Sequence, residues 1–472
     1  MLWKASVVGG FLAAFCLAGC AGAPDPAQTG EFKKLPLNSF DGYVLTENLD
    51  SPWNVVWGPD NWLWVSERAG KRITRVNPET GEKKVVGTID EAWPDTPHEG
   101  VLGFALAPGM LKGGENHIYV YYIHRVNGKR LGRIARYTYD PQTQTMGSPV
   151  NILDGMPAGN DHNGGRLIFG PDGKLYLSKG EMGHNQFGNA CLPIEAQRLP
   201  TTAEVAKKDW TAYVGKVLRL NPDGSIPDDN PVLGGVRSHV FTYGHRNPQG
   251  LAFSPAGRLY SCEHGPSSDD EINLLESGGN YGWPHVAGFR DDHGYVYANY
   301  SAAPNCKSLK WDPNVIPAGV PQQKETDWDA PNFREPLKTF YTVPKGFDFS
   351  DARNAGDGLD YVSWPTIGPS SILYYPQDGV IPAWRNSLIV TSLKNGAVYV
   401  VKLGESGKQT QGDAGREFLS QNRYRGAAVD PEGRRLFVIT DNGGSGRDET
   451  LAPTSEMKNP GSILVFRYTG DL

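Results

Sequence analysis

The feature that most constrains the fold is a short pattern that recurs six times. Each copy has an apolar residue, a turn rich in Pro, Gly or Asn, and then alternating apolar residues. The six copies are WGPDNWLWVSE, LAPGMLKGGENHIYVYY, FGPDGKLYLSKGE, FSPAGRLYSCEHG, PAWRNSLIVTS and VDPEGRRLFVITDN. Such turns between alternating segments predict β-hairpins. Because repeated antiparallel units cannot each bury both faces alone, the sequence predicts an all-β, six-bladed β-propeller, with a pair of β-sandwiches as the alternative.

The spacing of the repeats is uneven, with long intervals across 183–210 and 295–340. We expect these intervals to form long loops on one face of the propeller, where functional residues usually lie. The 58 glycines and 36 prolines are spread evenly, and no low-complexity linker divides the 472 residues. Residues 41–472 are therefore predicted to be one domain.

The chain begins with MLWKASVVGGFLAAFCLAGC, a lysine, an apolar run and a Leu-Ala-Gly-Cys box. This order predicts a lipoprotein signal peptide over 1–19, a lipidated Cys20 and a tether over 20–40, although a plain signal peptide is the alternative. We expect an exported protein, periplasmic or in the outer membrane, which associates with the membrane through its lipid anchor.

Charge and cysteine content exclude several functions. A formal net charge of -6 argues against a nucleic-acid partner. No CxxCH motif is present, so the chain carries no haem of its own, and the electrons of any redox reaction must pass to an external acceptor. Cys16 is lost with the signal and Cys20 carries lipid. Of the remaining Cys191, Cys262 and Cys306, the predicted disulfide joins Cys191 to Cys306, because Cys262 falls inside the candidate site.

That candidate site is the span 239–284, which combines a cationic GHRNPQG turn, an EHGP turn and an acidic SDDE run. Turns with Gly and Pro fix the direction of backbone carbonyls. Carbonyls and carboxylates are the ligands that calcium prefers. The guanidinium group beside them indicates an anionic ligand.

Several longer strings carry a family resemblance: WGPDNWLWVSERAGKRITRVNPETG, GKVLRLNPDGSIPDDNP, YGHRNPQGLAF, GPSSDDEINLLESGGNYGWP, GYVYANYSAA, NRYRG and NPGS. Through them the chain closely resembles the soluble, calcium- and pyrroloquinoline-quinone-dependent glucose dehydrogenases of the glucose/sorbosone dehydrogenase group, from about Leu49 to the C-terminus. The resemblance implies a six-bladed propeller and a homodimer. It also implies oxidation of a sugar's anomeric hydroxyl to a lactone, with electrons passed from the quinone to an external quinone or cytochrome.

The resemblance implies catalytic roles for His162, Asp161 and Arg246. His162, in PAGNDHNGGRL, would be the general base that takes the hydroxyl proton, and Asp161 would orient it or favour its protonated form. Arg246 would polarise the reactive carbonyl of the quinone. From the residues alone, a loop histidine is as often a surface residue, and Arg246 could pair with a carboxylate on a neighbouring blade.

The resemblance also implies a cofactor clamp. Arg246 and Asn247 lie in GHRNPQG, and the cations that would hold the cofactor's carboxylates are Lys394, Arg423 and Arg425. Alternation in NRYRG places both arginines on one face of an extended segment, with Tyr424 opposite. A solvated basic strand is the alternative.

Two calcium sites are implied in the same way. The carbonyls of Gly265 and Pro266 would bind the calcium that also holds the quinone. Asp269 and Asp270 are equally explained as turn caps. For a second, structural calcium the implied ligands are the side chains of Glu271, Asp291 and Glu325 and the backbone oxygens of Tyr281, Ala287 and Phe289.

The implied sugar contacts are His98, Gln186, Tyr361 and Trp364. This sequence departs from the glucose enzymes at His98, where glutamine is common, and at Glu181, where the family has Asp. The string ARNAGDGLDYVSWP also lacks the cysteine pair of the best-known relatives. These departures concern the identity of the sugar more than the reaction.

Two other functions stay open at this point. A calcium-dependent lactone hydrolase would need a calcium ringed by side-chain carboxylates at the propeller centre and no cationic clamp. A non-catalytic binding propeller would not need His162, Arg246 and the NRYRG cations together.

Overall fold

The computed structural model describes residues 34–35, 39–312, 315–350 and 360–470. The predicted signal peptide and most of the predicted tether lie outside the described residues. Among the described helices, none is both long enough and apolar enough to cross a membrane.

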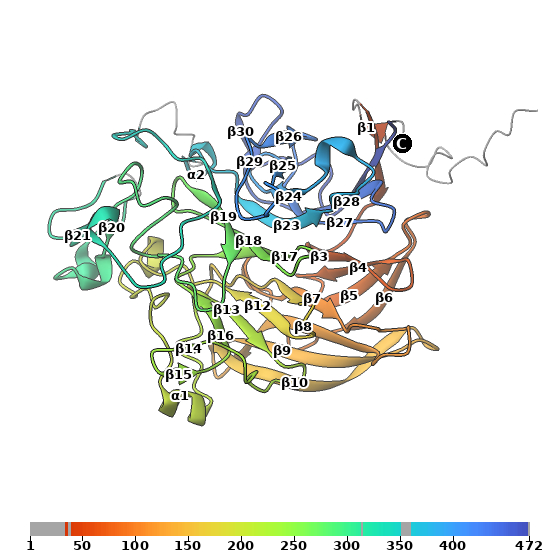
Figure 1. Cartoon of the computed structure of the whole chain (residues 1–472), viewed down its shortest axis with the longest axis horizontal. Helices are drawn as coiled ribbons and strands as arrows, with labels where there is room; N and C mark the ends of the chain where they lie inside the picture. Colours follow the sequence, from red (N-terminus) through yellow and green to blue (C-terminus); the bar gives the residue numbers. More distant parts are fainter. Residues whose placement is uncertain (1–33, 36–38, 313–314, 351–359, 471–472) are drawn as a thin grey trace, which may run out of the picture.

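Six antiparallel sheets form the six predicted blades (Figure 1). Blade 1 contains β3 (Pro52–Trp57), β4 (Leu63–Glu67), β5 (Arg72–Val76) and β6 (Lys83–Thr88), and blade 2 contains β7 (Val101–Leu106), β8 (His117–Val126), β9 (Lys129–Asp140) and β10 (Thr145–Pro157). Blade 3 contains β11 (Leu167–Phe169), β12 (Leu175–Lys179), β13 (Lys216–Leu220) and β16 (Val240–Tyr243), and blade 4 contains β17 (Pro248–Phe253), β18 (Leu259–Glu263), β19 (Asp270–Leu275) and β22 (Lys338–Phe340).

Blade 5 contains β23 (Pro369–Tyr375), β24 (Ser387–Ser392), β25 (Val398–Lys402) and β26 (Gly415–Glu417). Blade 6 contains β27 (Tyr424–Val429), β28 (Arg435–Thr440) and β31 (Ile463–Tyr468), followed by β2 (Phe40–Thr46) and β1 (Lys34–Leu35) from the other end of the chain. Each of the six recurring motifs forms the connection between the first two strands of a blade, so the six-bladed prediction is confirmed.

The first and last blades are joined by strand pairing and by packing. Strand β2 pairs with β31, with Tyr43 opposite Val465, so an N-terminal strand completes the last blade. The innermost strand of that blade, β27, also packs against β3 of blade 1. The ring is therefore closed by the pairing of strands from the two ends of the chain and by the packing of blade 6 against blade 1.

Packing of blade against blade explains the composition of the strands. All residues of β4, β12, β18 and β24, the second strands of four blades, are buried. A strand buried on both faces reads as an apolar run rather than a strict alternation. Between blades 5 and 6 the contact is aromatic, and Phe418 stacks on Phe466 with ring centroids 4.0 Å apart.

Long loops with short elements interrupt the blades. They carry η2 (Phe187–Asn189), α1 (Thr202–Lys207), β14 (Val232–Leu233), β15 (Val236–Arg237), β20 (Tyr297–Ala298), η3 (Tyr300–Ala302), η4 (Cys306–Ser308), β21 (Gln322–Gln323), η5 (Glu325–Asp327), α2 (Asp360–Ser363), η6 (Pro382–Trp384), β29 (Gly446–Arg447) and β30 (Pro453–Thr454). In Figure 1, β20 and β21 lie at the left of the molecule, and α1, β14 and β15 lie at its lower edge, left of centre. The predicted disulfide between Cys191 and Cys306 is confirmed, and it ties two of these loops together. Cys262 is free and buried.

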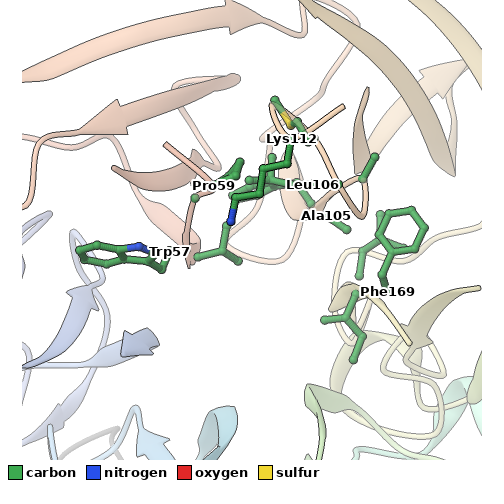
Figure 2. Close-up of a pocket in the computed structure, with 14 residues that line it drawn as sticks. Trp57, Pro59, Ala105, Leu106, Lys112 and Phe169 are labelled. Atoms are coloured by element: carbon green, nitrogen blue, oxygen red, sulfur yellow. The ribbon is translucent and has the colours of Figure 1, made fainter. Parts of the chain in front are cut away.

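A cavity of about 440 Å³ lies where the hairpin turns of blades 1 to 3 meet. Figure 2 shows Trp57 and Phe169 on opposite sides of this cavity, with Lys112 and Leu106 between them. The lining is mostly apolar and comes from the ends of the innermost strands. The predicted site residues precede those strands, so this cavity is at the other end of the propeller axis.

The side chain of Arg166, directly before β11, lies among the innermost strands of several blades. It is buried, and it donates hydrogen bonds to Asn54 Oδ1 of blade 1, to the carbonyl of Gln249 in blade 4 (3.1 Å) and to the carbonyl of Ser370 in blade 5 (3.1 Å). Its guanidinium group also stacks over Trp53, 4.7 Å from the ring centroid. One cation therefore joins blade 3 to blades 1, 4 and 5 across the propeller axis.

Candidate active site

The predicted catalytic and clamp residues come from segments at one end of the blades. His162 precedes β11, Arg246 precedes β17, Lys394 follows β24, and Arg423 and Arg425 lie at the start of β27. Because the innermost strands start at this end of the axis, these side chains from four blades face a common region.

His162 is held by a carboxylate. The imidazole is buried, and its Nδ1 lies 2.5 Å from Glu181 Oε1. Glu181 is itself fixed, because it accepts hydrogen bonds from the backbone amides of Gly183 (3.2 Å) and His184 (2.9 Å). With Nδ1 bound to Glu181, Nε2 is the nitrogen left for a ligand.

Asp161 lies beside His162, and its predicted role, to orient His162 or to favour its protonated form, stays a prediction. It accepts a hydrogen bond from the backbone amide of His162 (2.8 Å), and its carboxylate is 3.7 Å from the Nε2 atom of His162. It also lies 3.2 Å from Nε2 of His98 and accepts a 3.3 Å hydrogen bond from Gln186. Glu181, noted in the sequence only as a departure, makes the orienting contact with His162. Asp161 also connects His98 and Gln186 to His162.

Arg246 is connected to Asp161 and His162 through Gln186. Its Nη2 donates to Gln186 Oε1 (3.0 Å), and its guanidinium lies over the Trp283 ring, 5.2 Å from the centroid. The backbone amide of Arg246 donates to Glu263 Oε2 (3.2 Å). The buried Nε of Arg246 has no hydrogen-bond partner among the described residues. A buried donor without a partner is costly, and an acceptor on a ligand would satisfy it.

The two arginines of NRYRG share one carboxylate. Arg425 binds Asp441 in a bidentate way, at 2.8 Å and 2.7 Å, and Arg423 Nε donates to the same residue at 3.2 Å. Tyr424 is buried on the opposite side, as the alternation predicted. Asp441 follows β28 directly, and nothing in its local sequence distinguished it from other turn aspartates.

Lys394 completes the group of cations. It donates to Thr366 Oγ1 and is buried. Burial lowers the pKa of Lys394 to about 7, the nearby Asp270 opposes this shift, and Arg447 and Arg423 add to it. The positive groups here outnumber Asp270 and Asp441, so the region favours an anionic ligand.

The other predicted contacts border this region. Asn247 Oδ1 accepts hydrogen bonds from the amide of Gly164 (3.1 Å) and from Gln249 (3.0 Å). The carbonyl of Trp364 accepts hydrogen bonds from Arg447 (2.9 Å) and Lys394 (3.5 Å), so Trp364 lies on the side of the cations. Tyr361, in α2, is exposed.

The turn of Gly265 and Pro266 is fixed by Asp270. One carboxylate oxygen of Asp270 accepts from the amide of Gly265 (2.9 Å), and the other accepts from the amides of Ile367 (2.7 Å) and Gly368 (2.8 Å) in the next blade. A Cβ at position 265 would lie 2.0 Å from the carbonyl oxygen of Ser268, so only glycine fits this turn. Asp270 therefore caps the turn, which was one of the two interpretations of this residue from the sequence.

The residues of the implied second calcium site gather around the backbone of 287–292. Glu271 accepts from the amide of Gly288 (2.6 Å), and Glu325 accepts from the amides of Ala287 and Asp292 (both 3.0 Å). The carbonyl of Phe289 accepts from the amide of Asp291 (2.9 Å), and the ring of Tyr281 stacks on that of His245. In the part of the chain that the structure describes, no three His, Cys, Asp or Glu side chains meet closely enough to bind a metal.

Burial is the main cause of the pKa shift of Glu325, one of the residues of the implied second calcium site. It raises the pKa of Glu325 to about 8, with further contributions from the carboxylates of Asp291 and Asp269. A hard cation such as calcium stabilises buried carboxylates that repel one another, because their oxygens are the ligands that it prefers.

Comparison with known proteins places the chain in a family. The family model for glucose/sorbosone dehydrogenase matches residues 49–337 and 350–447. Quinoprotein glucose dehydrogenase B of Acinetobacter calcoaceticus is 45% identical over 455 residues, which are 94% of each chain. The chain belongs to the glucose/sorbosone dehydrogenase family, and the resemblance seen in the sequence is confirmed.

Solved structures agree with this assignment. The aldose sugar dehydrogenase of Streptomyces coelicolor in its PQQ-bound form is 25% identical, with a TM-score of 0.60 over 92% of this chain and 97% of that one. The soluble aldose sugar dehydrogenase of Escherichia coli, in its apo form, is 25% identical, with a TM-score of 0.63 over 91% and 99%.

Proposed function

We propose that this protein is a calcium- and pyrroloquinoline-quinone-dependent aldose dehydrogenase that oxidises the anomeric hydroxyl group of a sugar to a lactone. The observation that carries the proposal is the chain of contacts from Arg246 through Gln186 and Asp161 to His162. It joins a positioned base to a cation with a buried, unsatisfied donor. Family membership and the quinoprotein relative support the same conclusion.

The cations supply the cofactor clamp. Lys394, Arg423 and Arg425 would bind the carboxylates of the quinone, and Arg246 and Asn247 would lie against its reactive edge. The unsatisfied Nε of Arg246 and the surplus of positive charge fit a polyanionic, planar group. When bound, the quinone would accept the two electrons of the oxidation and release them to an external quinone or cytochrome.

His162 is the base of the reaction. Its Nδ1 hydrogen is donated to Glu181, so Nε2 takes the proton of the anomeric hydroxyl while a hydride leaves the anomeric carbon. The Glu181 carboxylate stabilises the imidazolium that results. The Asp161 carboxylate can accept hydrogen bonds from the sugar hydroxyls, and the Gln186 amide can both donate and accept them. His98, Tyr361 and Trp364 complete the pocket in this proposal.

Calcium would act at two places. The carbonyls of Gly265 and Pro266 would bind the ion that holds the quinone, in a turn that admits only glycine at its first position. Glu271, Asp291 and Glu325, with the backbone oxygens of Tyr281, Ala287 and Phe289, would bind a structural ion. The raised pKa of Glu325 supports the second site, because a cation would stabilise its charged form.

The cellular setting remains as the sequence predicts it. We propose export to the periplasm or outer membrane, a lipid anchor at Cys20, and assembly as a homodimer. The apolar run before the Leu-Ala-Gly-Cys box supports the export and the anchor. The resemblance supports the homodimer.

The two other functions are less well supported. A lactone hydrolase with a central calcium is disfavoured because the axis of the propeller is occupied by Arg166, a cation. A binding propeller is disfavoured because it would not require the contact between His162 and Glu181.

The test is reconstitution of metal-stripped mature protein with calcium and pyrroloquinoline quinone, followed by dye reduction with a panel of aldoses. We expect sugar-dependent reduction that requires both additions, with a lactone as the product. Dye reduction without the quinone, or hydrolysis of lactones in its place, would refute the proposal.

A further inference from the structure

Arg447 is attached to the segment 360–367, which carries two of the proposed sugar contacts, Tyr361 and Trp364. Its Nε donates to the carbonyl of Val362 (2.9 Å), and its Nη2 donates to the carbonyl of Trp364 (2.9 Å). These carbonyls lie at the C-terminal end of α2, where a helix leaves carbonyls without intrahelical partners. The planar guanidinium group presents its donors in a fixed geometry that lysine does not have, so one side chain fixes two points of this backbone.

The position of Arg447 is in turn set by the residues of the cofactor clamp. Arg447 lies in β29, which pairs with β30. Two residues earlier, the carbonyl of Ser445 accepts a hydrogen bond from Arg423. A Cβ at Gly446 would lie 3.1 Å from the carbonyl oxygen of Lys394, so β29 packs directly on the backbone that carries this lysine. The clamp and Arg447 therefore belong to one connected frame.

The segment has further attachments to blades 4 and 5. The amide of Tyr341, directly after β22, donates to the carbonyl of Pro365 (3.0 Å), and the amide of Lys394 donates to the carbonyl of Ile367 (3.0 Å). Both bonds lie on the C-terminal side of the segment, whereas the bonds of Arg447 reach back into α2. The segment contains no cysteine, so no disulfide can hold it.

The helical part of the segment needs such an attachment. Helix α2 has four residues, and a helix this short is not stable alone in water. The side chain of Tyr361 is 43% exposed, while that of Trp364 is 7% exposed. Fixing the backbone under these rings before a ligand arrives lowers the entropy cost of binding against them.

We propose that Arg447 is a positioning residue, which fixes the aromatic wall formed by Tyr361 and Trp364 before the sugar binds. The inference rests on the proposed function and deepens it. The Nε and Nη2 donors of Arg447 are used by backbone carbonyls, so its effect on the sugar is exerted through the wall. Loss of its fork should therefore weaken sugar binding and leave quinone binding and the oxidation of bound sugar unchanged.

A variant that keeps the charge tests this role. Arg447→Lys retains a positive charge near Lys394 but loses the fork. In reconstituted holoenzyme we expect KM for glucose to rise about three- to tenfold with kcat unchanged, the effect of having to order one large side chain on binding. The matched control is Arg416→Met, which removes a neighbouring charge from the exposed surface of β26 and should leave KM unchanged.

Two binding measurements separate the wall from the cofactor clamp. Methyl glucoside lacks a free anomeric hydroxyl and cannot be oxidised, so calorimetry with it reports binding alone. We expect Arg447→Lys to weaken methyl glucoside about three- to tenfold, as it does glucose. Titration followed by the absorbance of the quinone should give the wild-type affinity, because the charge is kept.

Hydrogen exchange measures the order of the segment directly. The backbone amides of 360–367 should exchange faster in Arg447→Lys than in wild type, with the amides of β27 unchanged, because only the attachment of this segment is weakened. Unchanged exchange, or faster exchange with unchanged KM, would overturn the positioning role.

Three further results bear on the inference. Losses of kcat and quinone affinity equal to the change in KM would make Arg447 part of the clamp, and equal effects of Arg447→Lys and Arg416→Met would mean that it has no role of its own; either would overturn the inference. If wild-type holoenzyme oxidised no aldose but bound methyl glucoside more tightly than Arg447→Lys did, the proposed function would fail and the positioning role would stand.

Discussion

The Nδ1 atom of His162 lies 2.5 Å from Glu181 Oε1, and Glu181 is held in turn by two backbone amides. This arrangement fixes the direction of the imidazole and leaves Nε2 as its reactive atom. A carboxylate that orients a histidine and stabilises its charged form is a common device of general-base catalysis. In this chain that carboxylate follows β12, so it is carried by the same blade as the base.

Replacing the carboxylate with an amide tests the arrangement. Glu181→Gln keeps the size of the side chain but removes the charge that stabilises the imidazolium, so we expect kcat to fall by about 10²-fold with KM changed little. Glu181→Asp keeps the charge and should recover part of the rate. Steady-state kinetics on reconstituted enzyme measures both. Equal losses in the two variants, together with weaker quinone binding, would mean that Glu181 supports only the fold of the site.

Removing one clamp cation tests the cofactor site. Arg425→Ala deletes two hydrogen bonds to Asp441 and a positive charge near the site. Because a charge-assisted hydrogen bond contributes about 1.5–3 kcal/mol, we expect quinone affinity to fall by about 10- to 100-fold. Titration followed by the absorbance of the quinone measures this. Arg385→Ala, an exposed arginine on the same protein, is the matched control and should bind the quinone normally.

Replacing the central arginine tests the propeller itself. Burial lowers the pKa of Arg166 to about 10, and its hydrogen bonds reach three other blades. Arg166→Met leaves those acceptors unsatisfied, at about 1–3 kcal/mol for each, offset in part by the apolar side chain. We expect the free energy of unfolding in urea to fall by about 3 kcal/mol. Lys408→Ala, at an exposed position, should change it by less than about 0.5 kcal/mol; similar values for the two variants would show that Arg166 does not join the blades.

Calcium removal tests the second metal site. At a calcium concentration 100 times its Kd, the ion should add about 2.7 kcal/mol to the free energy of unfolding. Glu325→Gln removes a buried charge, so the metal-free variant should be at least as stable as metal-free wild type, but it should gain less from calcium. Thermal melts with and without calcium measure both effects. If calcium raised the melting temperature of the variant as much as that of wild type, the ion would not bind at Glu325.

Local chemistry explains why the fold could be predicted. The six hairpins depend on turn residues beside short apolar runs, and both signals lie within about a dozen residues of sequence. The opposite faces of Arg425 and Tyr424 follow from strand alternation in the same way. The pairing of Cys191 with Cys306 followed from elimination among three cysteines.

The remaining contacts depend on how distant blades meet. Arg166 bonds Ser370, which is 204 residues away, and no pattern around either residue indicates the other. Strand β2 completes the last blade only because the ring closes. The contact between Glu181 and His162 spans 19 residues and needs the turn after β12 to bend back over the loop before β11.

The most direct test of the account is the reduction of bound quinone by glucose deuterated at the anomeric carbon, followed by stopped-flow absorbance without an external acceptor. We predict that calcium-loaded holoenzyme reduces its quinone in one turnover, more slowly with deuterium than with hydrogen at that carbon, and that His162→Ala binds the quinone but reduces it about 10²- to 10⁴-fold more slowly. Quinone that binds but is reduced by no aldose, or a His162→Ala variant that keeps the full rate, would contradict the account.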